Sequence, residues 1–549
     1  MLRPQPVQEI PVETARVAKA AFKKGTTVMR MRDAFGTLFN DADFANLFPV
    51  KGQPALAPWR LALVSVFQFL ENLTDRQAAD AVRGRVDWKY ALSLELEDPG
   101  FDFSVLSEFR DRLINGGEEK LLFDKLLERF KAEGLIKERG KQRTDSTFVL
   151  ANIRVMNRAE LVGETLRAAL NELAEVDPGW LRDLAQPEWF ERYGHRVEEY
   201  RLPKSKVARD AYLLTVGRDG SALLDALDKE ASEELTGLGK VQTLRAVWDR
   251  HYEREGERVR WREGAELSRA AQALESPYDP EAKYSTKRGK EWVGYKVHVT
   301  EACDAGCPRL IVGVLTMPAT QQDVSTTLSV HRALAAKHRL PGEHLVDAGY
   351  IDADLLVQMK RDYGVQLVGP PRGPKGWQTT VPGAFTAYDF TLDWQQERAV
   401  CPNGKTSASW KQHHQEGRYP RDLVKVRFAT ADCRACPLRE RCTRSPEQAK
   451  SLNLQPEAAF EALKAARAYI ASPKGREAYR LRAGIESTLS QGVRAFGLRR
   501  ARYQGEAKTQ LQETLVATAI NVARATRWLA GGRPEATRPS RFAALALTA

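Results

Sequence analysis

The sequence predicts an α/β protein of several domains, in which a mixed sheet with flanking helices is joined to an all-helical N-terminal domain, a helical insertion and a small cysteine-containing insertion. Three observations support this. Residues 1–140 are helical in pattern, strand-like segments occur at Asp145, over 292–300 and before Asp347, and a capped helix near the end of the chain carries Glu486. At 549 residues the chain exceeds a single hydrophobic core, which indicates two to four domains.

The composition narrows the class of partner and the compartment. A formal net charge of +12 and a pI near 9.3 favour a polyanionic partner, because clustered Lys and Arg release counterions when they bind phosphate. The apolar fraction of 43% is ordinary for a globular protein. The sequence has neither an apolar run long enough to cross a bilayer nor a signal-peptide core at its start, so we expect a cytoplasmic protein without a membrane partner.

Residues 1–140 are expected to form helices that begin at recognisable caps. The pattern predicts helices over 57–70, from the Thr74-Asp75 cap to Val82, and over 104–113. The first two, joined near Asn72, could be a helix-turn-helix that presents three arginines to DNA, Arg76, Arg83 and Arg85. The alternative is a plain helical bundle used for packing or dimerisation.

The first candidate strand begins at Asp145, where a charged approach gives way to β-branched and apolar residues, and it reaches about Val155. A capping box from Asn157 to Glu160 then starts a helical insertion that extends to about Ser276. The insertion contains Trp180, Trp189, Trp248 and Trp261. Such tryptophans could stack on unpaired bases, but buried packing in a helical layer is the commoner use, and we assign them no role.

Strand signals return over 292–300 and 310–315, which form a hairpin with a longer loop that contains Cys303 and Cys307. A helix over 326–337 follows, and then a short apolar segment that ends at Asp347. Lys296 and His298 share one face of the first strand. Each could approach a phosphate, although a solvated Lys and a hydrogen-bonded His fit the pattern equally well.

The late helix starts at Ser472-Pro473 and is expected to close at Gly497. Tyr479, Arg482 and Glu486 follow one another at steps of three and four, which places them on one helical face. Taken alone, Arg482 and Glu486 could be an ordinary surface pair. Beyond the helix, Arg499, Arg500 and Arg502 form a cationic run of the kind found beside a phosphate backbone.

Together these motifs resemble the DDE transposases of bacterial insertion sequences. The resemblance is carried by a strand-borne Asp145, by Asp347 in a D-x-G-Y pattern, and by the Y-x2-R-x3-E helix that contains Glu486. It is closest to the subgroup with a helical N-terminal domain and a cysteine cluster before the Glu, and it covers nearly the whole chain. One departure is visible, because the family often has Lys six residues after the Glu, where this chain has Gly492, with Arg494 as the possible substitute.

The resemblance implies a ribonuclease-H-like catalytic core and DNA cleavage followed by strand transfer. Asp145, Asp347 and Glu486 would hold two Mg²⁺ or Mn²⁺ ions, which carboxylate oxygens suit, with Arg482 orienting Glu486 or holding a phosphate and Tyr479 contacting the backbone near the cut. The partners would be double-stranded DNA, as element ends and as target, and a second copy of the chain in a homodimer. We would then expect a bacterial, nucleoid-associated protein.

Four cysteines predict a separate zinc site. Cys433 and Cys436 form a C-x2-C pair, and Cys401 and Cys442 flank it, which completes a four-thiolate set suited to Zn²⁺. A closed set of this kind leaves no open position for substrate, so its role would be to fold an insertion. The alternative is four reduced, buried cysteines. Cys303 and Cys307 lack two partners nearby and are interpreted as structural.

The resulting domain boundaries and candidate DNA contacts complete the prediction. The domains are a helical DNA-binding or dimerisation domain at 1–140, a catalytic core at 141–156, 277–375 and 456–508, a helical insertion at 157–276, a cysteine-cluster insertion at 376–455, and a C-terminal helix and tail at 509–549. The predicted DNA contacts are Lys296, His298, Arg494, Arg499, Arg500, Arg502 and Lys508.

Two other functions fit the same sequence. One is a transposase-derived DNA-binding protein that no longer cuts DNA, although the presence of all three acids argues against it. The other is a ribonuclease-H-like nuclease that cuts without joining. DNA-binding and cleavage assays separate the three possibilities.

Overall fold

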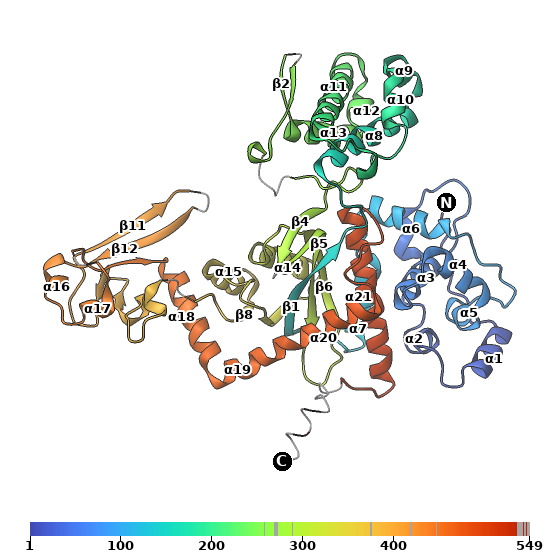
Figure 1. Ribbon diagram of the computed structural model, residues 1–549. Helices are drawn as coiled ribbons and strands as arrows, with labels where there is room; N and C mark the ends of the chain where they lie inside the picture. The colour runs from blue at the N-terminus through green and yellow to red at the C-terminus, as the bar shows by residue number, and fades with distance from the viewer. Residues whose placement is uncertain are drawn as a thin grey trace.

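The computed structural model describes residues 1–256, 258–267, 273–287, 289–373, 376–417, 420–445 and 447–534, together with residues 542 and 545. Figure 1 shows a central sheet, with the N-terminal helices on its right, the insertion after the first strand above it, and the cysteine-containing insertion at the left. The tail predicted after Gly531 lies mostly outside the described residues. In the part of the chain that is described, no helix is both long enough and apolar enough to cross a membrane.

The central sheet is mixed, with the strand order β4-β5-β1-β7-β8, and β6 pairs with β5. β1 runs antiparallel to β5 and parallel to β7, and β8 continues the parallel half. The strands are β1 (Arg139–Leu150), β4 (Lys283–Lys287), β5 (Lys290–Ala302), β6 (Ile311–Pro318), β7 (Pro341–Leu345) and β8 (Gln366–Val368). Helices α14 (Asp323–Ala336) and α15 (Ala353–Tyr363) follow β6 and β7. This arrangement is compatible with the expected ribonuclease-H-like core.

The N-terminal helices pack around an apolar helix, α3, of which almost every residue is buried. The helices are α1 (Val12–Ala21), α2 (Thr27–Phe35), α3 (Pro58–Leu70), α4 (Asp75–Gly84), α5 (Val86–Leu92), α6 (Ser104–Asn115) and α7 (Leu121–Ala132). The helices expected over 57–70, from the Thr74 cap and over 104–113 are thus present. Thr74 forms the expected cap, since its hydroxyl accepts from the Gln77 N–H and the Gln77 side-chain oxygen accepts from the Thr74 N–H.

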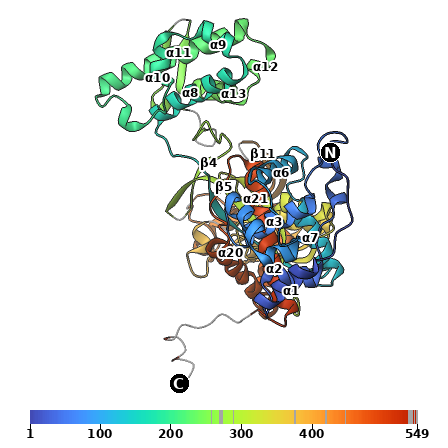
Figure 2. The same ribbon diagram turned by 90° about the vertical axis from the view of Figure 1, so that its right-hand side faces the viewer.

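A single long helix, α21 (Glu506–Leu529), joins these N-terminal helices to the sheet. It packs against β6 and against α2, α3, α6 and α7; Figure 1 shows it between the two parts, and Figure 2 shows it next to α3. Asn521 fixes it to the sheet edge, because its side chain both accepts from Ile311 N–H (2.8 Å) and donates to Ile311 C=O (2.7 Å). The buried apolar residues of the N-terminal helices, the sheet and α21 form one continuous core.

The insertion after β1 has a hydrophobic core of its own. It contains α8 (Arg158–Val176), α9 (Pro178–Leu184), α10 (Pro187–Tyr193), α11 (Lys206–Glu230), α12 (Glu233–Thr236) and α13 (Gly239–His251). The prediction of an all-helical insertion was incomplete, because a hairpin of β2 (Tyr252–Glu255) and β3 (Arg258–Trp261) follows α13. Each strand has only four residues and most of the side chains are charged, so the alternation in Arg258–Trp261 is too short to predict a strand.

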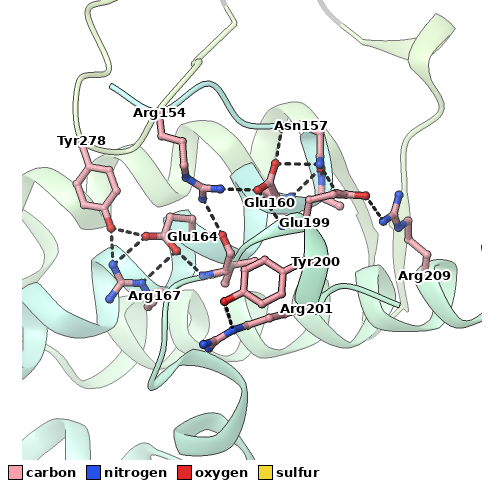
Figure 3. A network of polar contacts seen from close by, with 12 residues as sticks. Arg154, Asn157, Glu160, Glu164, Arg167, Glu199, Tyr200, Arg201, Arg209 and Tyr278 are labelled. Atoms are coloured by element: carbon pink, nitrogen blue, oxygen red, sulfur yellow. Dashed lines mark hydrogen bonds and ion pairs between the residues drawn. The ribbon is translucent and has the colours of Figure 1, made fainter. Parts of the chain in front are cut away.

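A polar network joins the insertion to the two segments that connect it with the sheet (Figure 3). Arg154, on the segment that enters the insertion, forms an ion pair with Glu160 and donates to Val197 C=O (2.7 Å). Tyr278, on the returning segment, donates to Glu164 (2.5 Å), and Arg167 donates to both of them. Both connections are therefore anchored on the first turns of α8.

The cysteine-containing insertion is a small layered unit around Phe390, Phe428 and Phe460. It contains β9 (Thr391–Asp393), β10 (Arg398–Val400), β11 (Ser409–Gln415), β12 (Arg421–Arg427), α16 (Thr430–Arg434), α17 (Arg439–Cys442) and β13 (Ser451–Leu454). Helix α18 (Glu457–Ala471) packs against α15 and leads back to the sheet. Isolated 3-10 turns lie at η1 (Asp41–Leu47), η2 (Glu199–Arg201), η3 (Gly264–Glu266), η5 (Trp377–Thr379) and η6 (Ala387–Asp389).

The helix predicted from Ser472 to Gly497 is interrupted. The chain forms α19 (Pro473–Arg480), a 3-10 turn η7 (Leu481–Ala483) and α20 (Gly484–Ala495), with the expected Ser472 cap at the start. Gly497 follows with φ of +71°, a backbone conformation that glycine adopts readily and that suits the end of a helix. Tyr479, Arg482 and Glu486 therefore lie on three successive elements rather than on one continuous helix.

Candidate active site

Asp145 lies in the middle of β1, whereas the sequence placed it at the strand's start. The strand begins earlier because the polar residues Gln142, Arg143 and Thr144 are buried between β5 and β7, where tertiary partners satisfy them. The Asp145 side chain is 14% exposed, and one of its oxygens accepts from Ser146 N–H (2.8 Å). Burial raises the pKa of Asp145, and the nearby Arg482 guanidinium opposes that rise.

Asp347 lies two residues beyond the end of β7, the strand that pairs with β1. Its carboxylate is about one third exposed and accepts from Gly349 N–H (2.7 Å). A Cβ at position 349 would lie 2.9 Å from an oxygen of Asp347, which explains the glycine in the D-x-G-Y pattern. The loop after β7 thus brings a second carboxylate to the end of the sheet where the β1 acid lies.

The guanidinium of Arg482 connects the three predicted acids. It lies 2.7 Å from Asp145, 3.1 Å from Glu486 and 3.7 Å from Asp347, each measured between a guanidinium nitrogen and a carboxylate oxygen. Glu486 comes from the first turn of α20 and is 68% exposed, while Arg482 is 14% exposed. Three carboxylates that are far apart in the sequence therefore meet around one cation.

A buried ion cluster holds the turn that carries Arg482. Arg143, on the same face of β1 as Asp145, donates to the backbone C=O of Leu481 and forms an ion pair with Glu301 of β5 (2.5 Å). Glu301 is fully buried and also accepts from Thr488 of α20 (2.5 Å) and Arg524 of α21 (2.5 Å). Strand β1 therefore binds η7 twice, since Arg143 contacts the Leu481 carbonyl and Asp145 contacts the Arg482 side chain. The sequence analysis did not predict this cluster.

The glycine at the start of α20 is required by this packing. A Cβ at position 484 would lie 2.1 Å from a guanidinium nitrogen of Arg143. The close approach places α20, and with it Glu486, directly against β1.

Two aromatic hydroxyls lie near the acids. Tyr479, in α19, has a raised pKa because of burial, and the charges of Arg482, Asp347 and Asp145 also act on it. Tyr350, the last residue of the D-x-G-Y pattern, is fully buried and its hydroxyl is 2.7 Å from His298 Nδ1. This contact anchors the Asp347 loop to β5.

A further carboxylate, Asp323, lies beside this loop and was missed by the sequence analysis. It begins α14, three residues before the predicted start of that helix, and is 15% exposed. Ser146 Oγ donates to it (3.3 Å), and Lys296 Nζ lies 3.7 Å away. The sequence signal for Asp323 is an Asp in the first turn of a helix. Such residues commonly stabilise the N-terminus of a helix through its dipole, so the signal does not by itself indicate a functional site.

The predicted DNA contacts on β5 point into the protein. His298 is 1% exposed, and burial lowers its pKa to about 4. Lys296 donates to Gln321 C=O (2.7 Å) and is 14% exposed. The interpretation of His298 as a hydrogen-bonded internal histidine, one of the two left open, matches its position.

The cationic residues at the end of α20 and after it divide into two groups. Arg494 and Arg500 are exposed, whereas Arg499 donates to Thr147 (2.7 Å) and lies over the Phe148 ring. Arg502 donates to the backbone of Leu73 and to the side chain of Asn72, both at 2.6 Å. Arg502 thus ties the segment after α20 to the turn between α3 and α4.

Lys508 lies near the start of α21, where it forms a surface ion pair with Asp111 of α6 (3.0 Å). In the possible helix-turn-helix, Arg85 pairs with Glu71 and Asp87, Arg83 donates to Pro99 C=O (3.1 Å), and Arg76 covers the Phe103 ring. Each of these side chains has a partner within the N-terminal helices.

The four cysteines of the second insertion come together. Cys401, Cys433, Cys436 and Cys442 line one cavity of about 30 Å³. The Lys405 N–H donates to Cys401 Sγ (3.4 Å), and Lys450 Nζ donates to Cys442 C=O (2.9 Å). Burial raises the pKa of the Cys442 thiol, while the charge of Lys450 lowers it. Four thiolates are the donor set that Zn²⁺ prefers, although within the described ranges these cysteines are not arranged so that three of them could hold the ion as they stand.

The acids offer oxygen donors that suit Mg²⁺ or Mn²⁺, and they share a single cation, Arg482. Within the described ranges, however, no group of three or more His, Cys, Asp and Glu side chains is arranged so that it could hold a metal ion as it stands. At the acids, the guanidinium contacts all three carboxylates. Metal binding there would require Arg482 to move.

Two protein-family models match parts of the chain. Residues 16–112, which span most of the N-terminal helices, match a transposase domain (DUF772), and residues 400–526 match a transposase DDE domain. The second range includes the four cysteines and Glu486, while Asp145 and Asp347 lie outside both. A comparison with curated proteins gives no significant match. Because both matches are to transposase domains, they indicate a DDE transposase of the insertion-sequence type.

Proposed function

We propose that this transposase binds the ends of its insertion sequence, hydrolyses a DNA strand there, and joins the freed 3′-hydroxyl to target DNA. Asp145, Asp347 and Glu486 are the proposed ligands of two divalent cations, Mg²⁺ or Mn²⁺. The observation that carries the proposal is the convergence of these three acids on Arg482, from a central strand, the loop of its neighbour and a late helix. A surface pair of Arg482 and Glu486 would not involve either aspartate.

The chain's own residues have distinct proposed roles. When bound, the cations would activate the attacking water or 3′-hydroxyl and stabilise the leaving oxygen. Arg482 balances the charge of the carboxylates before DNA binds, and its guanidinium has the geometry to bind a phosphate oxygen once it moves. Tyr479 is proposed to contact the DNA backbone near the cut. Arg494, in the last turn of α20, and Arg500, beyond it, are both exposed and are the proposed phosphate contacts.

The test uses isosteric variants of the acids and duplex DNA that carries the sequences flanking the coding region. Asp145→Asn, Asp347→Asn and Glu486→Gln should each lose strand cleavage in Mg²⁺ or Mn²⁺ by a factor of at least about 100 while DNA affinity persists. Asp362→Asn is the matched control, because this exposed aspartate forms an ion pair with its neighbour Arg361 on the surface of α15. Cleavage that survives all three substitutions would refute the assignment of the acids.

The same assay separates the alternatives. A protein that binds the ends but never cuts them, with either metal, is a catalytically silent DNA-binding protein. One that cuts but gives no joined product when target DNA is supplied is a nuclease. Because two ends must be brought together, we propose a homodimer as the working form, which light scattering with and without end DNA can detect.

For the second insertion we propose a structural zinc ion held by Cys401, Cys433, Cys436 and Cys442. The support is that all four side chains line the same cavity, with a backbone N–H already directed at one sulfur. The small apolar core of this unit makes a stabilising metal physically reasonable.

A further inference from the structure

A second concave site lies beside α20, on a face other than the one that carries Glu486. Its volume is about 360 Å³, within the range of ligand pockets in proteins. Gly484, Thr488 and Gln491 line it from α20 at helical spacing, and the loop before β6 and the C-terminal end of α21 close the other sides.

The lining is strongly cationic. Four arginines surround the cavity, and the residues that line it include no carboxylate: Arg309, Arg524, Arg527 and Arg533. The nearest acid in the network, Glu301, is fully buried and is neutralised by Arg143 and Arg524. The cavity therefore presents an excess of positive charge to whatever enters it.

The base of the cavity is organised before any ligand arrives. Arg524 is only 18% exposed, and its guanidinium donates to Glu301 (2.5 Å), Thr488 (2.8 Å) and Gln491 (3.0 Å). At the rim, Arg309 and Arg527 are exposed. Because Arg524 is already held in place at the base, it loses little conformational entropy when an anion binds.

The net positive charge of the chain lies outside the insertion that follows β1. The insertion at 157–276 contains 19 Lys and Arg against 24 Asp and Glu, so it is net negative although the whole chain is at +12. The excess of positive charge therefore belongs to the rest of the protein, which includes α20, α21 and the loop before β6.

We propose that the cavity binds backbone phosphates of a DNA segment that lies along α20 and α21, separate from the segment held at the three acids. Arginine guanidinium groups and serine hydroxyls donate hydrogen bonds to the phosphate oxygens of DNA. Ser487 lines the cavity together with the four arginines. The inference rests on the proposed function for the identity of the polyanion and adds a site to it.

The test compares the double variant Arg309→Ala/Arg527→Ala with a charge-matched control, Arg16→Ala/Arg129→Ala. The control residues form exposed ion pairs on α1 and α7, far along the chain from the cavity. Affinity for duplex DNA is measured by fluorescence anisotropy over a range of salt. The cavity variant should bind about 10-fold or more weakly at low salt, with a salt slope reduced by about 1–2, and the control should match the wild type.

The outcomes distinguish this inference from the proposed function. Equal affinity and equal salt slope for the cavity variant, the control and the wild type would overturn the inference, even if the wild type cuts DNA. Weaker binding by the cavity variant alone supports it, even if no cleavage is found. Both rim arginines are exposed, so thermal unfolding of the variants should be unchanged and loss of folding can be recognised directly.

Discussion

Replacing Glu301 with Gln should destabilise the core strongly, because this carboxylate neutralises two arginines. Glu301 is fully buried and accepts from Arg143, Thr488 and Arg524 at 2.5–2.6 Å. A glutamine has the same shape, but its NH₂ group would face hydrogen-bond donors where a carboxylate oxygen now accepts. Both guanidinium groups would also lose their counter-charge. Breaking a buried pair in this way costs about 3–5 kcal/mol.

Differential scanning calorimetry measures the effect. For the continuous core around α21, the loss corresponds to a decrease in the unfolding midpoint on the order of 10 °C. Glu343→Gln is the matched control, the same chemical change in the same sheet. Glu343 pairs with Lys141, which is 43% exposed, so about 0–1 kcal/mol is expected.

Equal shifts for the two variants would refute the reasoning that the Glu301 cluster is a buried, charge-balanced unit. A second readout connects the cluster to catalysis. Since Arg143 holds the backbone of Leu481, Glu301→Gln should also reduce DNA cleavage at temperatures where the variant remains folded, while Glu343→Gln should not.

Three further predictions concern other parts of the chain. Burial lowers the pKa of His251 to about 3, so between about pH 6.5 and pH 3 this histidine binds a proton only when the insertion is unfolded. The free energy of unfolding of the insertion should therefore fall by about 2 kcal/mol from pH 7 to pH 5. Urea denaturation followed by tryptophan fluorescence checks this, and an unchanged pH slope in His251→Gln would contradict it. Cys436→Ser should lose the zinc that elemental analysis detects, whereas Cys307→Ser should retain it; equal metal content in the two variants argues against the site. Arg502→Gln should lower stability by about 2 kcal/mol, because its guanidinium holds the α3–α4 turn. A loss of DNA affinity without a loss of stability would instead make Arg502 a phosphate contact.

Local signals in the sequence were sufficient for many helices. Thr74, Asn157 and Ser472 each accept a backbone N–H at the helix start where the pattern predicted a cap. A cap depends only on residues within one turn, so it can be recognised without knowing what the helix packs against. The strand over 292–300 was likewise recognisable, because alternating apolar residues mark its buried face.

Segments whose polar residues are satisfied by distant partners could not be predicted in this way. The first half of β1 contains Gln142, Arg143 and Thr144, which resemble a loop until β5 and β7 cover them. The break at η7 depends on Arg143, which binds the backbone of Leu481. Asp323 begins a helix and Asp347 follows a strand, so no local sequence pattern connects them. Only the folded sheet brings both beside Gly349.

The sequence by itself indicated the class of the protein and its three candidate acids through motifs that resemble those of DDE transposases, and the spacing of its cysteines indicated four candidate zinc ligands. Only the tertiary structure decided that Arg482 joins all three acids, that Glu301 supports the turn beneath them, and that a cationic cavity lies beside α20. The physical reason is that charge balance and burial arise between segments that are hundreds of residues apart in the chain.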